Sequence, residues 1–423
     1  MFKKLINLFK NKELRKKVLT ILLLLFVFRV MANIPLPGVD QAKLQDFFKQ
    51  NQIFGLFNIF TGGAMSNISI AFLGIGPYIT SSIIFQLLTM VFPSLKQMLQ
   101  EGTEKERKQF EQYSRMFTIP LALLQGFAML NLLKSQGVVT ILSPFDLIRN
   151  LTVVVASTMI LMWIGELITE QKLGNGISLI IFAGIVIDLP RQLLATFMSL
   201  TLERLPNLVV FLGVAFLIII GVVFVSQGER RIPVNYAKQV RGTKIYGGAT
   251  TYLPMKVNQA GVIPIIFALS ILMFPQMIGQ FLSTTTNPFL LKIALALKGF
   301  DTNSLVYLIL YFVLVFLFTF FYTSVTFEPE SIADNLQKRG GFIPGYRPGK
   351  TTANYLSSLS SKITLFGALF LSAIAVLPIL LEKVSGVTTL AIGGTSLLIM
   401  VEVAIETMRA IESQLIMREY ENV

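Results

Sequence analysis

The fold of this chain depends on whether residues 176–190, GISLIIFAGIVIDLP, cross a membrane. The stretch is apolar but shorter than the roughly 20 residues that a helix needs to span a hydrocarbon core. Asp188 and Pro190 also interrupt its outer end. If it spans, the chain has ten crossings and both termini lie in the cytoplasm. If it does not, every later segment is inverted.

The distribution of basic residues favours a crossing at 176–190. With ten spans, 26 of the 36 Lys and Arg residues fall in inner segments and 9 in outer segments, and Arg29 lies within the first span. Without that crossing, the six basic residues of 227–256 would lie outside, against the positive-inside rule. We therefore predict an all-α polytopic protein with spans at 18–36, 72–92, 116–134, 151–168, 176–190, 208–226, 257–281, 304–326, 363–381 and 389–408.

Composition agrees with a membrane protein and excludes several functions. The mean hydropathy is +0.68, and 53% of the residues are hydrophobic against 14% charged, which leaves too little polar surface for a soluble protein of this length. The chain has no Cys and no His, so it can build no disulfide, thiol nucleophile, imidazole base or His-bearing metal site. We predict no cofactor and no metal.

The net charge of +13 suits anionic phospholipid and also an acidic partner or RNA. The lysine-rich N-terminus, 1–17, is typical of a lipid-facing flank. The two long cytoplasmic loops mix their basic residues with Gly, Pro and Tyr, a pattern that lipid attraction explains less well.

Two halves of five spans each are predicted, and an odd number per half gives the second half the opposite orientation. This inverted symmetry is inferred from parity, because no residue repeat is visible. The predicted organisation is a cytoplasmic N-terminus 1–17, a first half 18–196, an outer hinge loop 197–207, a second half 208–410 with cytoplasmic loops 227–256 and 327–362, and a tail 411–423.

Chemical motifs are weak. Gly345 to Thr351 resembles a phosphate-binding loop but has three residues between its glycines instead of four. Energy for transport is therefore expected from a partner or a gradient. The candidates for charged residues at mid-membrane are Arg29, Glu166, Glu402 and Glu406. Glu166 and Glu406 lie near cytoplasmic ends, where snorkelling relieves their burial, and Glu402 is expected to have a structural partner.

The segment 53–71 is apolar but broken by Gly62, Gly63 and several polar residues. It is too interrupted to span, so it is either a re-entrant or outward-facing helix buried by protein or an ordinary interfacial helix.

Eight short motifs follow one another along the chain: FNIFTGGA at 57–64, GPYI at 76–79, MWIGE at 162–166, GNGIS at 174–178, RRIPVNYAK at 230–238, GVIP at 261–264, PGYRPG at 344–349 and GGTSLLI at 393–399. Each alone is unspecific. Together and in this order they resemble the bacterial SecY family, which forms the channel of the Sec protein translocon. The resemblance extends from the first span to the tenth.

This resemblance implies a clamshell of two inverted five-helix halves around an hourglass pore. The pore would be closed outside by a plug, 56–68, and would open to lipid through a lateral gate between spans 2 and 7. Family positions imply a plug containing Phe57, Asn58, Ile59, Phe60, Thr61, Gly62, Gly63 and Ala64. They imply a pore ring of Ile75, Ile79, Ile177, Ile181, Ile266 and Ile399. They imply gate residues Thr80, Gln125 and Asn258, and docking residues Arg241, Lys244 and Arg347 for SecA or the ribosome.

The expected function is conduction of unfolded preproteins and sideways release of transmembrane segments into lipid, without enzymatic activity. Expected partners are SecE, SecG, SecA, the ribosome, preproteins with their signal peptides, and anionic phospholipid. The expected location is the bacterial plasma (inner) membrane. Two alternatives remain: a secondary transporter of a small solute, which would require charged groups at the midplane, and a lipid-modifying enzyme, which would require clustered carboxylates.

Overall fold

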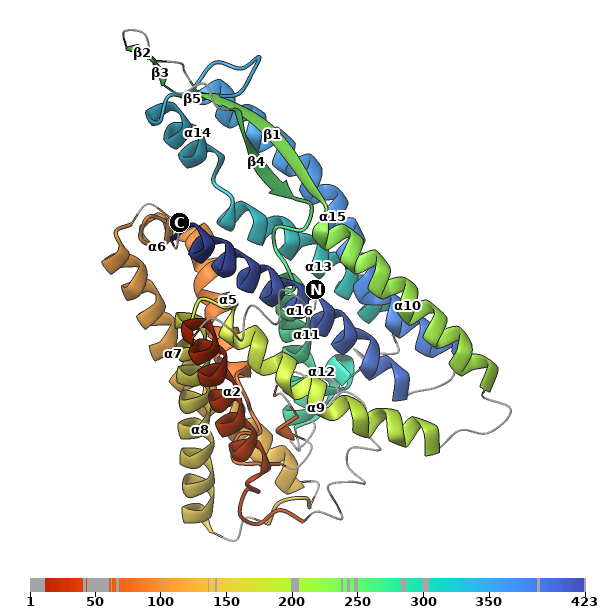
Figure 1. Ribbon diagram of the computed structural model, residues 1–423. Coiled ribbons are helices and arrows are strands. Elements are labelled where there is room, and N and C mark those ends of the chain that lie inside the picture. The colour runs from red at the N-terminus through yellow and green to blue at the C-terminus, as the bar shows by residue number, and fades with distance from the viewer. Residues whose placement is uncertain are drawn as a thin grey trace. The chain divides into compact units, whose positions relative to one another are not determined.

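A computed structural model describes residues 12–40, 43, 61, 63–65, 68–100, 102–135, 137–140, 143–198, 205–236, 239–241, 244–246, 250–282, 287–298, 304–385 and 389–421 (Figure 1). The chain divides into two compact units. Unit 1 comprises Met1–Leu212, Leu269–Leu308 and Pro378–Val423, and unit 2 comprises Gly213–Ala268 and Ile309–Leu377.

Each predicted span overlaps a helix. These helices are α2 (Lys12–Asn33), α5 (Gly76–Val91), α7 (Glu104–Ser135), α8 (Pro144–Glu170), α9 (Gly176–Met198), α10 (Leu205–Gln227), α11 (Ile263–Leu282), α13 (Leu305–Thr326), α15 (Lys350–Ser385) and α16 (Thr389–Glu421). Among the described residues, four helices are long and apolar enough to cross a membrane, and α5 with α6 (Pro93–Gln100) forms a pair bent by 117°. The chain is thus a multi-pass membrane protein, and the count of ten spans stays a prediction.

Two helices begin several residues later than the predicted spans. Span 2 was predicted from residue 72, but residues 70–75 form turns and α5 starts at Gly76, with Pro77 in its first turn. Span 7 was predicted from 257, but α11 starts at Ile263. Asn258 accepts a hydrogen bond from the Gly261 N–H at 3.0 Å, and Gly261 has φ +62°. Proline in a first turn marks a helix start, and a glycine with positive φ marks a turn before the helix, whereas hydropathy alone shows neither.

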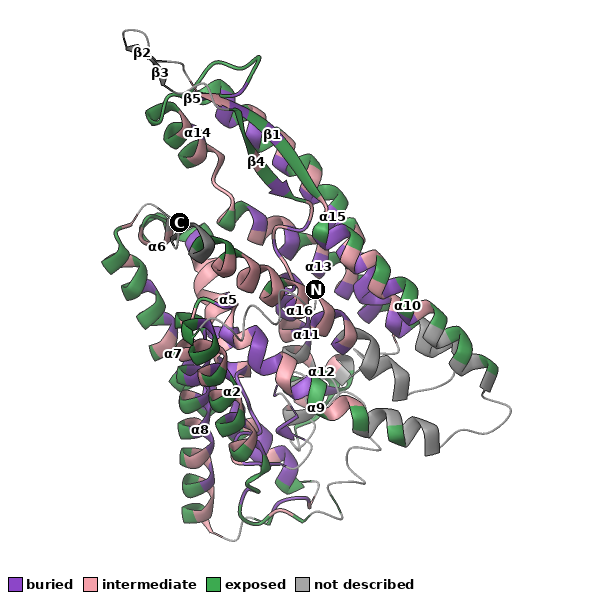
Figure 2. Cartoon of the chain, viewed as in Figure 1, coloured by how far each residue is buried: buried purple, intermediate pink, exposed green. Residues whose placement is uncertain are grey.

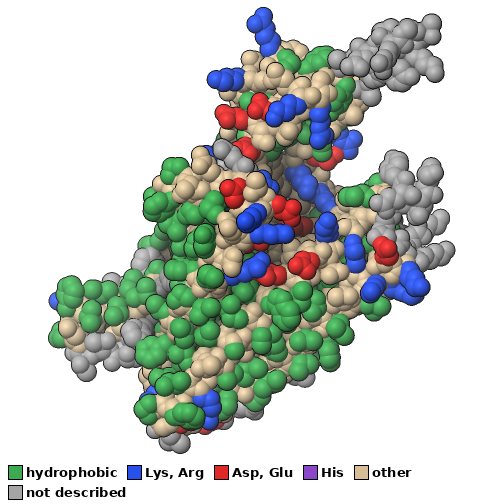
Figure 3. Space-filling view, turned by 90° about the vertical axis from the view of Figure 1, so that its left-hand side faces the viewer, with side chains coloured by type: hydrophobic (Ala, Val, Ile, Leu, Met, Phe, Trp, Pro, Cys, Tyr) green, Lys and Arg blue, Asp and Glu red, His purple; other side chains and the backbone are tan. Residues whose placement is uncertain are grey.

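Large apolar side chains remain exposed along the helices. Leu23 and Phe26 on α2 are 63% and 67% exposed, and Phe224 on α10 is 79% exposed. Figure 2 shows exposed residues along the outer sides of these helices, and Figure 3 shows a broad hydrophobic area with few charged side chains. Exposed apolar surface on this scale would promote aggregation in water, whereas it is expected of helices that face lipid.

Unit 1 is a helical bundle in which α5 packs on α7, α7 on α8, α8 on α9, and α9 on α16. Ser81 of α5 donates a hydrogen bond to the Ser114 carbonyl of α7 at 2.6 Å, and Phe85 packs edge-on against Phe110 and Phe117. Small hydroxyl residues allow close helix approach and satisfy polar groups within lipid.

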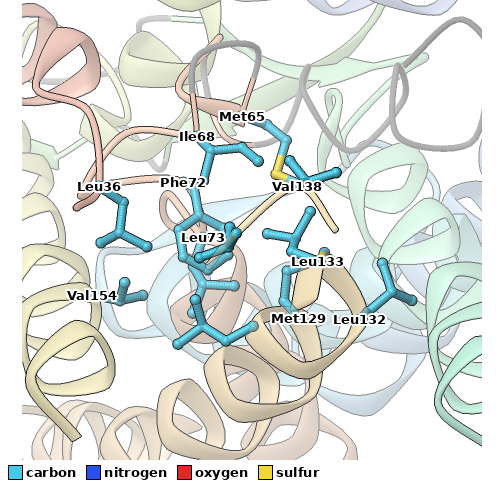
Figure 4. Packing of buried hydrophobic residues seen from close by; sticks show 12 residues of the cluster. Leu36, Met65, Ile68, Phe72, Leu73, Met129, Leu132, Leu133, Val138 and Val154 are labelled. Carbon is cyan, nitrogen blue, oxygen red and sulfur yellow. The ribbon is translucent and has the colours of Figure 1, made fainter. Parts of the chain in front are cut away.

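The segment before α5 belongs to a buried core in unit 1. Met65, Ile68 and Phe72 pack with residues from α7 and the loop after it, including Met129 and Leu133 (Figure 4). The Leu36 N–H also donates to the Ile68 carbonyl at 3.0 Å. This segment is therefore fixed by packing and by backbone hydrogen bonds.

The two ends of the described chain meet in unit 1. Lys17 Nζ of α2 donates to Gln414 Oε1 of α16 at 2.9 Å, and Gln414 Nε2 donates to the Lys172 carbonyl in the turn between α8 and α9 at 3.4 Å. All three residues lie in segments predicted to be cytoplasmic. Their proximity agrees with termini on one side of the membrane and therefore with an even number of spans.

Unit 2 contains a β-sheet that the all-α prediction did not include. Strands β1 (Glu229–Tyr236), β4 (Thr250–Lys256) and β5 (Gly341–Phe342) pair antiparallel in the order β4-β1-β5, and β2 (Gln239–Arg241) pairs with β3 (Lys244–Tyr246). The inward residues Ile232 and Val234 pack with Ile343 and with Leu356 of α15. The sheet thus depends on contacts across the two long loops (Figure 1).

The described residues also include three shorter helices: α6, α12 (Pro288–Lys298) and α14 (Pro329–Lys338). Side-chain caps define two of the helix starts. Ser143 and Asp146 form a capping box at α8, and the Thr103 N–H donates to Glu106 Oε2 at 2.6 Å before α7. The Thr103 hydrogen bonds lower the pKa of Glu106, because they favour its ionised form.

Candidate functional site

The predicted pore isoleucines occupy buried positions. Ile75 and Ile79 lie at the start of α5, and Ile181 and Ile399 lie in α9 and α16 of unit 1. Ile177 of α9 is half-buried. Ile266 is buried in unit 2. The contact between α9 and α16 brings two of the ring-bearing helices together. Burial is also expected of ordinary core residues, so the ring stays a prediction.

The turn before α9 sets the position of Ile177 and Ile181. Gly176 approaches α8 so closely that a Cβ atom there would collide with the Gly165 carbonyl oxygen. The Thr169 hydroxyl donates to the same carbonyl at 2.9 Å and accepts from the Gly176 N–H at 2.9 Å. Only glycine permits this approach, which explains glycine at 176.

Gly176→Ala should lower the free energy of unfolding by about 3 kcal/mol, because the added methyl group has no space between two backbones. Thermal unfolding of the purified protein, followed by loss of the monodisperse peak in size-exclusion chromatography, would measure the effect. Gly213→Ala on α10 is the matched control, since a Cβ atom there meets nothing within 4 Å. Equal stability of the two variants would contradict the prediction.

The predicted gate residues differ in their surroundings. Thr80 of α5 and Gln125 of α7 are buried in unit 1, on two helices that pack together. Asn258 is buried in unit 2, where its side chain caps the turn at Gly261. The sequence placed Asn258 at the lateral gate and did not predict this local role before α11.

The plug prediction is only partly within the described residues. Thr61, Gly63 and Ala64 are described, whereas Phe57, Asn58, Ile59, Phe60 and Gly62 lie outside the described residues. Thr61 and Ala64 are fully buried, and Thr61 Oγ1 accepts from the Met65 N–H at 3.2 Å. Burial of this end by protein favours a protein-enclosed segment over an interfacial helix.

The loop that carries Arg347 is rigidly built in unit 2. Tyr346 stacks on Tyr355 of α15 with ring centroids 4.0 Å apart, and the Arg347 carbonyl accepts from Thr352 Oγ1 at 2.8 Å. Gly345 and Gly349 have φ values of +87° and +93°, which favour glycine. The Arg347 side chain is exposed between these fixed points. Arg241 and Lys244 are paired residues at the ends of β2 and β3.

An ion pair that the sequence did not predict joins α7 and α8. Arg115 Nε lies 2.5 Å from Glu166 Oε1, and both side chains are partly shielded from solvent. Snorkelling was expected to relieve the burial of Glu166, but Glu166 has a fixed partner in Arg115. In the sequence, Arg115 counts only as one of the basic residues that set the topology. The signal was an acidic residue at the cytoplasmic end of one predicted span and a basic residue beside the cytoplasmic end of the span before it. Among the described residues, no group of His, Cys, Asp and Glu could hold a metal.

Comparisons with known proteins agree with this architecture. A family model described as SecY matches residues 69–408. The protein translocase subunit SecY of Mycobacterium bovis is 42% identical, with 100% of this chain and 99% of that protein covered. The Helicobacter pylori protein of the same name is 41% identical, with 98% and 99% covered.

Solved structures of low sequence identity share the fold. One described as a protein-conducting channel has a TM-score of 0.65 at 17% identity, covering 94% of this chain and 91% of that chain. Canine Sec61 in a ribosome–channel complex has a TM-score of 0.63 at 16% identity, covering 94% and 91%. Since the family model covers most of the chain and relatives above 40% identity cover its whole length, this chain belongs to the SecY family.

Proposed function

We propose that this chain is the pore subunit of a Sec translocon, which conducts unfolded preproteins across the membrane and releases transmembrane segments sideways into lipid. This proposal rests on the match of the SecY family model to residues 69–408, a range that contains every residue assigned to the ring, the gate and the docking loops. Relatives of similar length are named protein translocase subunits, and a structural neighbour is described as a protein-conducting channel.

The physical logic of the site fits a polypeptide substrate. A chain in transit varies in chemistry, so a conducting pore cannot offer fixed binding groups. Branched apolar side chains such as those of Ile79, Ile181 and Ile399 form a constriction that excludes water and ions when empty. The pore is proposed to be a conduit, with the energy supplied from outside it.

We propose SecA and the ribosome as the docked partners, SecE and SecG as the associated subunits, and the bacterial plasma membrane as the location, with both termini cytoplasmic. Structural neighbours include ribosome-bound Sec61 and Ssh1 channels. The exposed Arg347 and the hairpin positions Arg241 and Lys244 are the proposed docking residues.

Reconstitution tests this function. The chain should co-purify with a small single-span subunit and, in proteoliposomes with SecA and ATP, should protect a preprotein from added protease. Protection should require both SecA and ATP. Saturable uptake of a small solute by the chain alone, without SecA-dependent protection, would support the secondary transporter instead.

Deletion of residues 56–63 should increase the resting ion current through reconstituted channels and relax signal-sequence selectivity, while export continues. The deletion stops before Ala64 because Met65 and Ile68 belong to the buried core. A related SecY structure is described in terms of a plug that stabilises the closed state and maintains a membrane seal. Planar bilayer recordings would measure the current. A deletion channel as tight as the parent would refute the plug assignment.

A further inference from the structure

Asp188 of α9 lies directly against the described end of the plug segment. A Cβ atom built on Gly63 would be 2.7 Å from Asp188 Oδ2 and 3.2 Å from its Cγ, so the carboxylate fills the space where a side chain of residue 63 would be. Gly63 has φ +82°. From the sequence, Asp188 only blunts the outer end of the fifth span.

The neighbouring residues Thr61 and Ala64 are also held by contacts. Thr61 packs against Gly74, where an added Cβ atom would lie 2.6 Å from the Thr61 Cα atom. Ala64 is fully buried, and its carbonyl accepts from Ser69 Oγ at 3.1 Å. The turn thus contacts the residues before α5 through Thr61 and contacts Asp188 through Gly63.

The position of Asp188 on α9 relates this contact to the predicted ring. Ile181 lies four residues after Ile177, and Asp188 lies seven residues after Ile181. Intervals of four and seven residues return to the same face of an α-helix. One face of α9 therefore carries two predicted ring residues and, about two turns further along, the carboxylate that contacts the plug segment.

We propose that Asp188 is a positioning residue that latches the plug segment in its closed position. This proposal rests on the proposed role of 56–68 as the plug. Asp188 is half-buried near the outer end of the fifth predicted span, and a carboxylate that is partly withdrawn from solvent needs a polar partner. Backbone amides around a positive-φ glycine favour an adjacent anion. Displacement of α9 by an entering chain would move Asp188 away from Gly63, so opening the ring would release the plug.

Asp188→Ala should increase the resting ion current several-fold in planar bilayers, with export retained. Asp188→Asn keeps the shape and one acceptor oxygen and should leak less than Asp188→Ala. Asp40→Ala is the matched control, because Asp40 is an aspartate that is predicted to lie on the same outer side and is exposed. A parental current in Asp188→Ala would overturn the latch.

A double-variant cycle separates this proposal from the plug itself. If Asp188 acts through the plug, Asp188→Ala should add no current to the 56–63 deletion. Additive currents would overturn the latch. If the deletion channel leaks and the Asp188→Ala channel does not, the latch is refuted and the plug assignment is retained. If the deletion channel does not leak, the plug assignment is refuted.

The absence of native cysteine permits a direct test of proximity. In a Gly63→Cys, Asp188→Cys variant, oxidation should form a disulfide, because the Gly63 Cβ position lies 3.2 Å from the Asp188 Cγ position. Gly63→Cys alone controls for the strain that a side chain brings at φ +82°. The crosslink should block export, and a reductant should restore it. Normal export by fully crosslinked channels would overturn the latch.

Discussion

Replacement of Ile79, Ile181 and Ile399 together by Ser should raise the resting ion conductance by about tenfold, the factor that corresponds to a barrier lowered by about 1.4 kcal/mol. Hydroxyl groups at the constriction would hold water, and a wetted constriction passes ions that a dry apolar one excludes. The same variant should export preproteins with defective signal sequences more readily. Planar bilayer recordings and a protease-protection assay would measure the two effects.

The matched control replaces three exposed isoleucines, Ile148, Ile160 and Ile309, by Ser. These side chains face outward, so their replacement should reduce stability in lipid without increasing conductance. Ile→Val at the three ring positions should keep the channel tight, since valine is branched and apolar. A Ser variant that folds normally and stays tight would show that Ile79, Ile181 and Ile399 serve packing alone.

Arg347→Glu should leave the chain inserted and stable but lower SecA-driven export by about tenfold, as expected when a charge of the wrong sign opposes a partner. The side chain is exposed, and the stacked Tyr346 and the Thr352 hydrogen bond hold its loop independently of its charge. Export rates in proteoliposomes and SecA binding to the same membranes would be measured together.

Arg339→Glu provides the control, because Arg339 is also exposed at the end of α14 and carries the same charge in the same loop. If positive charge in this loop serves membrane topology alone, both variants should behave alike. Normal export by Arg347→Glu would refute the docking role. Loss of export in both variants would indicate a general electrostatic surface.

The sequence alone determined the membrane class and the positions of the helices. Apolar length and basic-residue asymmetry are local properties, and they predicted a helix at 176–190, where α9 begins at Gly176. The ordered motifs predicted the SecY fold, which the family match and the structural neighbours confirmed. Helix starts were less predictable, because Pro77 and the Asn258 turn define them more sharply than hydropathy does.

Only the tertiary structure decided which distant residues meet. The partner of Glu166 is Arg115 on another helix, β1 pairs with β5 across two loops, and Lys17 meets Gln414 at the other end of the chain. The contact of Asp188 with Gly63 is of the same kind. The hydropathy pattern of a helix can be read from one segment of sequence. Which distant residue a side chain contacts depends on how helices pack and which loops close, so no single segment determines that contact.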